Sequence, residues 1–291
     1  MQAPAPENNG SVLQLDLCER IERAESGLAR CEVCELRCGA NRLNGEPAPC
    51  GLGAESYTYK RHLSLAEEVE LLPAYLVYLS GCNMRCRFCI QGHDCFDPRR
   101  GEQVNPDTLA AELGCAIDRG TKTITFIGGE PGLHPHTILR VAEAAGRRMP
   151  IALKTNLYLT PKTLDLLDGV VRVYVVDYKF GSDRCAKSLA GIDRYTGVMQ
   201  RNLRIVARRG QLIIRHLLMP GHLDCCLRPV AEWIADNLPA ADFRLMEGYV
   251  PAWRAEGDAR LGRTCSASEL AEAAALVRSL GLNAKGESDV T

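Results

Sequence analysis

The sequence lacks an excess of charge of either sign, a long apolar run and a secretory signal. Its 35 Lys and Arg residues balance 36 Asp and Glu, so the net charge of -1 gives no electrostatic case for nucleic-acid binding. No stretch of about 18 uncharged apolar residues is present, and residues 1–10 carry neither the basic nor the apolar region of a signal. We therefore expect no nucleic-acid partner, no membrane association and a location in the reducing cytoplasm, where structural disulfides are unfavourable.

Cysteine is the residue type that departs from an ordinary globular composition. The chain has 291 residues, of which 46% are hydrophobic and 24% charged, enough for one large domain with a small appendage. Its 14 cysteines are about 5% of the chain, too sparse for a small disulfide scaffold and too many for a cytosolic protein without a use for thiols. We therefore expect the cysteines to bind metal.

The chain divides into three predicted parts. Residues 1–30 comprise a disordered tail, rich in Pro, Asn and Gly over 1–11, and a short amphipathic helix. The apolar face of this helix carries Leu13, Leu17, Ile21 and Leu28. Residues 31–60 have cysteines but no apolar period and are predicted to form a metal-binding module, and residues 70–291 form the main domain.

Short β-rich runs alternate with helical stretches in the main domain. The predicted strands are 75–79, 123–127, 151–155, 170–176, 212–216 and 243–246. The predicted helices are 105–118, 137–147, 161–167, 195–207, 225–237 and 266–280. Six β/α repeats imply a parallel sheet with right-handed crossovers, so the predicted α/β fold is a partial (β/α)6 TIM-like barrel with a small metal-stapled N-terminal module. Functional residues in such folds lie at the carboxyl ends of the strands.

Three cysteines follow the first predicted strand in the segment SGCNMRCRFCIQ. Cys82, Cys86 and Cys89 have the spacing Cys-x3-Cys-x2-Cys. Three thiolates are one fewer than the four that usually close an iron-sulfur cluster or a structural zinc site. A cubane cluster with three cysteine ligands keeps one iron open for a substrate or cofactor. The alternative is a zinc site completed by His62 or His93.

This spacing, with Phe88 just before the last cysteine, resembles the signature of the radical S-adenosylmethionine (SAM) superfamily. Gly-Gly-Glu-Pro at residues 128–131, after the second strand, resembles its second motif. The resemblance implies a 4Fe-4S cluster on the three cysteines and SAM on the open iron. It further implies reductive cleavage of SAM to a 5'-deoxyadenosyl radical that abstracts hydrogen from a substrate. The residues of these two motifs that would bind SAM are Phe88, Gly128, Gly129, Glu130 and Pro131.

Later matches resemble the glycyl-radical activating enzymes, typified by the pyruvate formate-lyase activating enzyme. Thr155-Asn156 resembles a Thr-Asn-Gly motif of that branch, in which Lys154 and Leu157 take the places of its Asp and Gly. The pair Asp177 and Lys179 resembles its Asp-Leu-Lys, and Arg215 its Arg before a Pro-Gly turn. SAM carries an ammonium, a sulfonium and a carboxylate, so a carboxylate and cations suit it. The predicted cofactor-binding residues from this branch are Thr155, Asn156, Asp177, Lys179 and Arg215.

Four further cysteines form what we call the cysteine knot: Cys31, Cys34, Cys38 and Cys50. We expect them to hold zinc or a second 4Fe-4S cluster, with zinc preferred because one Cys-x2-Cys pair and two scattered thiols match ribbon-like zinc sites. Reduced thiols without metal are the alternative. The segment 31–51 resembles the N-terminal part of an uncharacterised subgroup of activating-enzyme-like proteins. Activating enzymes with extra clusters usually carry those cysteines after the radical-SAM motif.

The sequence thus predicts a radical SAM oxidoreductase. The leading substrate is a protein partner, as in glycyl-radical enzyme activation, and the alternative is a small molecule, lipid or peptide. A non-catalytic iron-sulfur protein is a distant third. We expect a flavodoxin or ferredoxin as electron donor. Seven cysteines have no predicted role: Cys18, Cys95, Cys115, Cys185, Cys225, Cys226 and Cys265. Of these, Cys115 is predicted to be a core residue of a helix.

Overall fold

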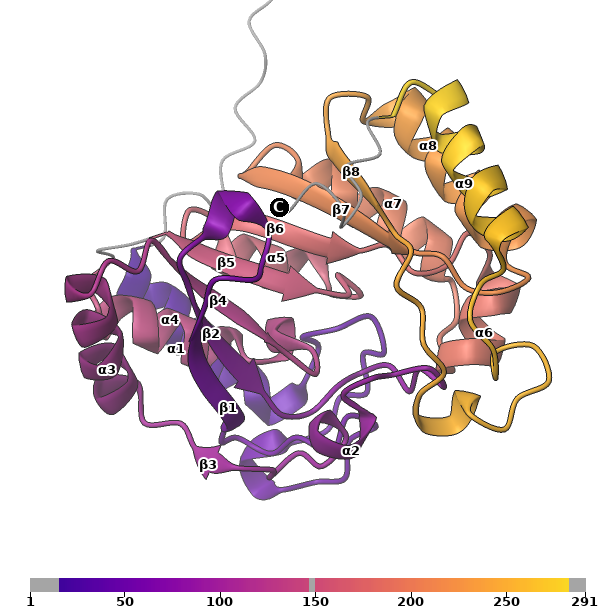
Figure 1. The fold of residues 1–291 in the computed structure, drawn as a ribbon. Coiled ribbons are helices and arrows are strands. Elements are labelled where there is room, and N and C mark those ends of the chain that lie inside the picture. The colour runs from indigo at the N-terminus through magenta and orange to yellow at the C-terminus, as the bar shows by residue number, and fades with distance from the viewer. Residues whose placement is uncertain (1–15, 147–149, 283–291) are drawn as a thin grey trace, which may run out of the picture.

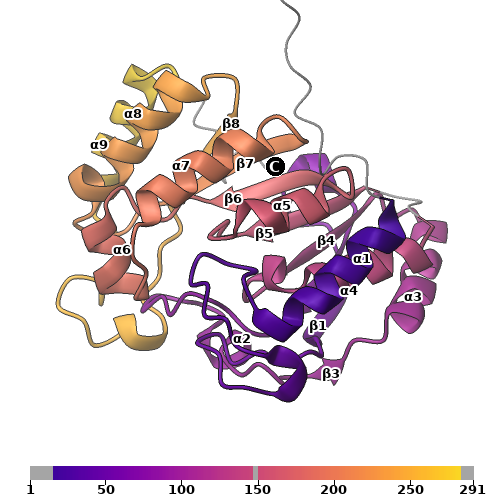
Figure 2. The ribbon, with the colours of Figure 1, turned by 180° about the vertical axis from the view of Figure 1, so that it is seen from behind.

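The computed structural model describes residues 16–146 and 150–282 as one curved sheet with helices packed outside it (Figures 1 and 2). The predicted tail over 1–11 and Leu13 lie outside the described residues. The described strands are β1 (Tyr57–Ser64), β2 (Ala74–Leu79), β3 (Glu102–Gln103), β4 (Thr123–Gly128), β5 (Ile151–Thr155), β6 (Val171–Asp177), β7 (Gln211–Leu217) and β8 (Asp242–Met246). Their order in the sheet is β3-β1-β2-β4-β5-β6-β7-β8.

The six predicted strands are confirmed as β2 and β4 to β8, which pair in parallel with their neighbours. β3 and β8 are the edges of the sheet, so the barrel is open. The sequence did not predict β1, which pairs antiparallel with β2 and continues the sheet toward β3. β1 is mostly exposed or half-buried and therefore lacks the apolar run of a central strand. The predicted module boundary at residue 60 falls inside β1.

The six predicted helices of the main domain are present, with ends shifted by a few residues. The described α-helices are α1 (Leu17–Ser26), α2 (Gly92–Cys95), α3 (Pro106–Asp118), α4 (Pro135–Ala144), α5 (Pro161–Leu167), α6 (Asp183–Ala190), α7 (Tyr195–Val206), α8 (Arg228–Asn237) and α9 (Ala267–Ser279). Proline opens α3, α4 and α5, where its missing N–H needs no partner. The sequence did not predict α2 or α6. A π-helical turn, η5 (Leu223–Leu227), precedes α8.

The inner face of the sheet changes from apolar to polar along the strands. Residues at the strand starts form a buried cluster that fills the barrel: Leu71, Ala74, Leu76, Ala152, Val173, Val175 and Ile213. Because side chains of a strand alternate between faces, the next inward positions are Tyr78, Lys154, Asp177 and Arg215. Leu71 ends the short 3-10 helix η3 (Val69–Leu71) and closes the barrel at this end. A hollow therefore remains only toward the carboxyl ends of the strands.

The cysteine knot packs onto the barrel. Cys34 forms an antiparallel bridge with Leu159, in the loop after β5. Arg42, from the 3-10 helix η2 (Arg42–Asn44), is almost fully buried and donates to the carbonyls of Gly53 at 2.8 Å and Leu133 at 3.0 Å. On the other side α1 lies beside α4, and Figure 2 shows both on the outer face of the sheet. The knot is thus tied to both loops that follow β4 and β5.

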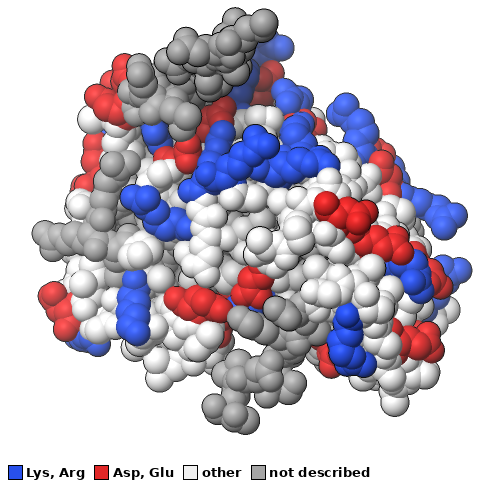
Figure 3. All heavy atoms as spheres, turned by 90° about the horizontal axis from the view of Figure 1, so that it is seen from above, with Lys and Arg blue, Asp and Glu red and all other residues white. Residues whose placement is uncertain are grey.

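None of the helices in the described ranges combines the length and the apolar character that crossing a bilayer requires. On the face seen in Figure 3, Lys and Arg side chains lie among acidic and neutral ones. This distribution matches the balanced charge of the sequence.

Gly129 should be the least replaceable glycine at the end of β4. Its N–H donates to the Leu79 carbonyl at 2.8 Å, and a Cβ there would lie 2.1 Å from the carbonyl oxygen of Gly81. We expect Gly129→Ala to lower the free energy of unfolding by about 2 kcal/mol or more. Gly114→Ala, in open space on α3, should raise it by roughly 0.5–1 kcal/mol. Urea unfolding of both variants measures the difference; equal midpoints would contradict the close contact.

Candidate active site

The loop 82–89 after β2 is held by backbone hydrogen bonds. The N–H groups of Arg85 and Arg87 donate to the carbonyls of Ala190 at 3.1 Å and Leu189 at 2.8 Å, at the end of α6. The Asn83 side chain donates to the Tyr158 carbonyl at 3.1 Å. These contacts fix the loop from both sides.

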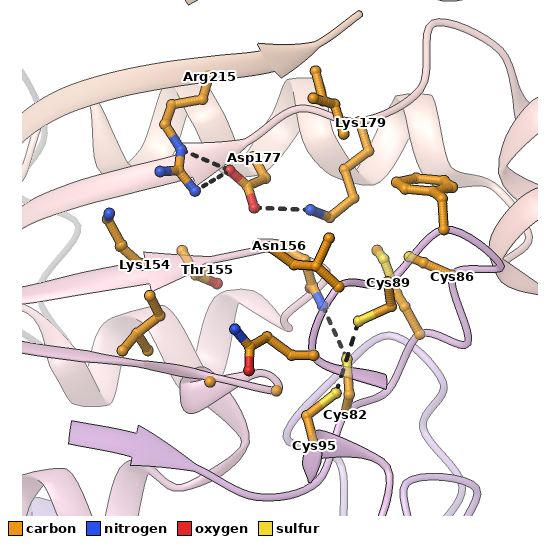
Figure 4. A pocket seen from close by; sticks show the side chains of 18 of the residues that line it. Cys82, Cys86, Cys89, Cys95, Lys154, Thr155, Asn156, Asp177, Lys179 and Arg215 are labelled. Atoms are coloured by element: carbon orange, nitrogen blue, oxygen red, sulfur yellow. Dashed lines mark hydrogen bonds and ion pairs between the residues drawn. The ribbon is translucent and has the colours of Figure 1, made fainter. Parts of the chain in front are cut away.

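The three predicted cysteines line a cavity of about 420 Å³ at the carboxyl ends of the strands (Figure 4). Cys82 and Cys86 are buried and Cys89 is half-buried. Eight of the ten predicted cofactor-binding residues also line the cavity: Phe88, Gly128, Gly129, Thr155, Asn156, Asp177, Lys179 and Arg215. Glu130 and Pro131 do not line it. The predicted residues thus make up 11 of the 24 that line the cavity.

The spacing of the three sulfurs suits a cluster better than a single ion. The sulfurs of Cys82, Cys86 and Cys89 do not all lie within 4.8 Å of one another. Among the described residues, one other group of possible metal ligands meets that limit. Tetrahedral zinc, with Zn–S bonds of about 2.3 Å, holds its sulfurs about 3.8 Å apart. His62 stacks on Tyr78 and His93 packs against Trp253, so neither completes a zinc site with the trio. In a cubane cluster each cysteine sulfur binds a different iron, so the sulfurs lie farther apart than around one zinc ion. The wider spacing of the three sulfurs agrees with this arrangement.

The thiols of Cys82 and Cys86 are protonated at neutral pH unless metal replaces their protons. Burial raises the pKa of Cys86 to about 12 and that of Cys82 well above its usual value. A hydrogen bond from Cys95, whose sulfur is 3.9 Å away, lowers the pKa of Cys89. Cys95 is buried on α2 and lines the cavity as a fourth sulfur. Its position six residues after Cys89 was the signal in the sequence.

Asn156 connects the trio to β5. Its side-chain nitrogen lies 3.9 Å from the Cys82 sulfur and donates to Asn83 Oδ1 at 2.8 Å. Its side-chain oxygen accepts from the Tyr158 N–H at 3.0 Å. A donor beside a cluster sulfur is one of the contacts by which proteins adjust a cluster's potential.

Glu130 lies behind the cavity wall. Its carboxylate accepts from the Thr155 hydroxyl at 2.6 Å, the Asn156 N–H at 2.6 Å and the Gly132 N–H at 2.8 Å. Burial raises its pKa to about 7, although these three donors favour the ionised form. Pro131 opens the buried 3-10 helix η4 (Pro131–Leu133). The described Glu130 contacts join the ends of β4 and β5.

Leu157 has a left-handed backbone, with φ of 54°. The activating-enzyme motif has glycine at this position, which adopts such a conformation without strain. The N–H of Leu157 donates to the Thr155 hydroxyl at 2.8 Å, and its side chain is fully buried. Packing and this hydrogen bond hold Leu157 in the left-handed conformation.

Asp177 lies between two cations in the cavity (Figure 4). Its carboxylate is 2.8 Å from Lys179 Nζ and 2.7 Å from Arg215 Nη2. Burial alone would raise the pKa of Asp177, but the charges of Arg215 and Lys179 outweigh it and hold the pKa well below its usual value. Asp177 therefore carries its charge at neutral pH and fixes both cations.

The charged network continues into the barrel through Glu67 and Glu68, which the sequence analysis did not identify. Arg215 Nη1 is 3.0 Å from Glu68, and Lys154 Nζ is 2.8 Å from the same carboxyl group. Lys154 also contacts Glu67. Both glutamates lie in the connection between β1 and β2. A lysine on the inner face of a buried strand requires a carboxylate partner, and this was the available signal.

Two of the other cysteines and a histidine form the compact group mentioned above: its members are Cys185, His222 and Cys225. Cys115 is exposed on α3, which corrects the prediction that it is a core residue. The helix turns the opposite face, with Leu109 and Leu113, toward the core.

An open α/β barrel with a three-thiolate loop and a charged cavity at its strand ends defines a class of iron-sulfur-dependent barrel proteins. The sequence model of the Radical SAM superfamily matches residues 76–234, more than half of the chain. The chain therefore belongs to the radical SAM superfamily. Membership implies a 4Fe-4S cluster and SAM as cofactors.

An uncharacterized protein of Methanocaldococcus jannaschii, MJ0674, is 33% identical over 276 residues, covering 92% of this chain and 80% of its own. SuiB of Streptococcus suis, solved with S-adenosylmethionine, has a similar fold, with a TM-score of 0.51 and 15% identity over 70% of this chain. The match spans 48% of SuiB. A domain of the pyruvate-formate lyase-activating enzyme of Bacteroides vulgatus has a TM-score of 0.46 and 22% identity, covering 57% of this chain and 98% of the domain.

Replacing Glu68 should show how much the buried ion pairs contribute to the free energy of unfolding. Glu68→Gln removes the carboxylate shared by Lys154 and Arg215, and we expect a loss of about 3 kcal/mol in the free energy of unfolding. The matched control is Glu102→Gln, whose exposed carboxylate pairs with Arg61 at 3.0 Å and should contribute under about 1 kcal/mol. Urea unfolding at neutral pH compares them. Equal losses in the two variants would show that the inner pairs are no stronger than a surface pair.

Proposed function

We propose that this protein is a cytoplasmic enzyme that cleaves SAM reductively at a 4Fe-4S cluster on Cys82, Cys86 and Cys89 and abstracts hydrogen from a substrate. The observation that carries the proposal is the convergence of three thiols on a cavity of about 420 Å³ that also contains fixed cations and a carboxylate. When bound, the cluster and SAM supply the electron transfer and the hydrogen-abstracting radical. The protein supplies binding, orientation and exclusion of water.

Lys179 and Arg215 are suited to the carboxylate of SAM. Both cations are fixed by Asp177, so little side-chain entropy is lost when a second anion binds. Asp177 itself offers negative charge for the ammonium or sulfonium group. Gly128 and Gly129 leave the strand end without side chains, which allows a ligand to approach the backbone closely.

The leading substrate is a segment of a protein partner, as in glycyl-radical enzyme activation. Two features favour it: the matches to activating enzymes at Thr155-Asn156, Asp177 and Arg215, and an apolar cavity mouth. Ile90 and Val250 line the mouth and are 72% and 53% exposed, and such exposure favours contact with a partner. The second candidate is a small molecule, lipid or peptide. Lys154, which replaces an Asp of the activating enzymes and lines the cavity, favours it.

A small redox protein such as a flavodoxin or ferredoxin is the proposed electron donor. Cys89 is the most exposed of the three cluster cysteines, so the cluster lies nearest the surface at this residue. The neighbouring Ile90 offers an apolar contact for such a donor.

The cysteine knot is proposed to hold a second 4Fe-4S cluster. Cys31, Cys34 and Cys50 are buried. Burial raises the pKa of Cys34 to about 12, and the nearby Cys50 and Cys31 act in the same direction. No three of the four knot sulfurs, all within the described ranges, lie mutually within 4.8 Å, and this spacing favours a cluster over the zinc that the cysteine spacing suggested. Asn83, next to Cys82, also donates to Cys34. The proposed role of this second cluster is to pass electrons toward the trio.

Cys86→Ala should abolish formation of 5'-deoxyadenosine. We expect the reconstituted wild type to produce it from SAM with dithionite under anaerobic conditions, and the variant to fall at least about 100-fold because one cluster ligand is missing. Chromatography of the products measures it. The control is Cys115→Ala, whose exposed thiol lies on α3 and should leave activity unchanged. Wild-type protein that yields no more 5'-deoxyadenosine than Cys86→Ala would refute the proposed activity.

The iron content should separate the two cysteine sets. We expect about eight irons per chain in the wild type and about four in Cys31→Ala/Cys34→Ala, because each cubane contains four irons. Mössbauer spectra should show one remaining cluster in the double variant. Four irons in both proteins, with zinc lost only from the double variant, would show that the knot holds zinc.

A further inference from the structure

Cys185, His222 and Cys225 place two sulfurs and an imidazole nitrogen within 4.8 Å of one another, and the described residues contain no other such group of three. Cys185 lies in the first turn of α6, His222 precedes η5 and Cys225 lies within it. None of the three lines the cavity of the cluster cysteines. Cys185 and His222 are buried, whereas Cys225 is half-buried and open to solvent on one side.

A backbone hydrogen bond fixes the tautomer of the His222 ring. Its Nδ1 is 2.8 Å from the Pro220 carbonyl oxygen, which can only accept, so Nδ1 carries the proton and donates it. The lone pair then lies on Nε2. Ligating histidines usually donate their other ring N–H to a carbonyl or carboxylate in this way, which fixes the tautomer and the ring plane.

The loop before α6 and the π-helical turn η5 approach each other closely. A Cβ on Gly181, in the loop before α6, would lie 2.4 Å from the carbonyl oxygen of Cys226. Glycine at 181 thus allows η5 to pack against this loop. The π-helical turn η5 is itself a rare conformation that occurs often at functional sites.

We propose that Cys185, His222 and Cys225 bind one zinc ion, with a solvent molecule as the fourth ligand. Two thiolates and an imidazole are typical zinc ligands, and tetrahedral geometry places such atoms about 3.3–3.8 Å apart. Cys226 does not belong to the group, although its sulfur is 4.0 Å from that of Cys225. The zinc joins the first turn of α6 to the segment between β7 and α8. It is separate from the cluster and independent of the function proposed above.

Metal analysis of the full-length holoprotein tests this site. Protein is incubated with one equivalent of zinc, passed over a desalting column and assayed for zinc and iron. We expect one zinc per chain in the wild type and loss of at least about four-fifths of it in Cys185→Ser, His222→Ala and Cys225→Ser, with iron unchanged. The matched control, Cys265→Ser, removes a half-buried thiol nearby, 3.5 Å from the Leu218 carbonyl, and should retain zinc. Zinc retained by all three variants would overturn the site.

Zinc K-edge X-ray absorption of the intact protein supports the test if the variants do not fold, because it needs no substitution at the site. We expect two sulfur and two nitrogen or oxygen scatterers, both in the wild type and in Cys31→Ala/Cys34→Ala. A shell of four sulfurs would place the zinc in the cysteine knot and contradict the proposal. Absence of bound zinc from both proteins would also contradict it.

Discussion

The buried carboxylate of Glu130 joins the ends of β4 and β5, and the order of the site depends on this contact. Its three donors are the Gly132 N–H, the Thr155 hydroxyl and the Asn156 N–H. A carboxylate without water must be fully hydrogen-bonded, so the three donors are fixed relative to one another. Asn156 in turn holds Asn83 and approaches the Cys82 sulfur. One acidic side chain thus aligns the glycine pair of β4, the turn after β5 and the loop of the cluster cysteines.

The charged side chains inside the barrel have a net charge of zero when counted together. This balance explains why the barrel tolerates them. Lys154, Lys179 and Arg215 face Glu67, Glu68 and Asp177 in one continuous network. Within this network each carboxylate contacts at least one cation of opposite charge. The network begins where the apolar filling of the barrel ends. Four of its members, Lys154, Asp177, Lys179 and Arg215, line the cavity.

The sequence predicted those parts of the fold that leave a periodic signal. Central parallel strands are buried on both faces and appear as apolar runs, so β2 and β4 to β8 were found, whereas the half-exposed β1 was not. The cluster cysteines and eight further residues of the cavity lining follow from motifs at strand ends. The orientation of Glu130 depends on donors 25 and 26 residues away and has no local signal. The same holds for the partnership of Glu68 with Lys154 and Arg215, and for the approach of Cys185 to His222.

The short helix α6 connects two sets of cysteines: the set that includes Cys185 and the three cluster cysteines. Its first turn carries Cys185, and its last turn supplies the Leu189 and Ala190 carbonyls that hold the loop of Cys82, Cys86 and Cys89. A helix of eight residues is about 12 Å long and moves as a rigid unit. Any displacement of its first turn is therefore passed to the loop of the cluster cysteines. A metal bound by Cys185, His222 and Cys225 would restrain that displacement, and the cluster loop would be fixed from the far end of α6 as well as through Asn83.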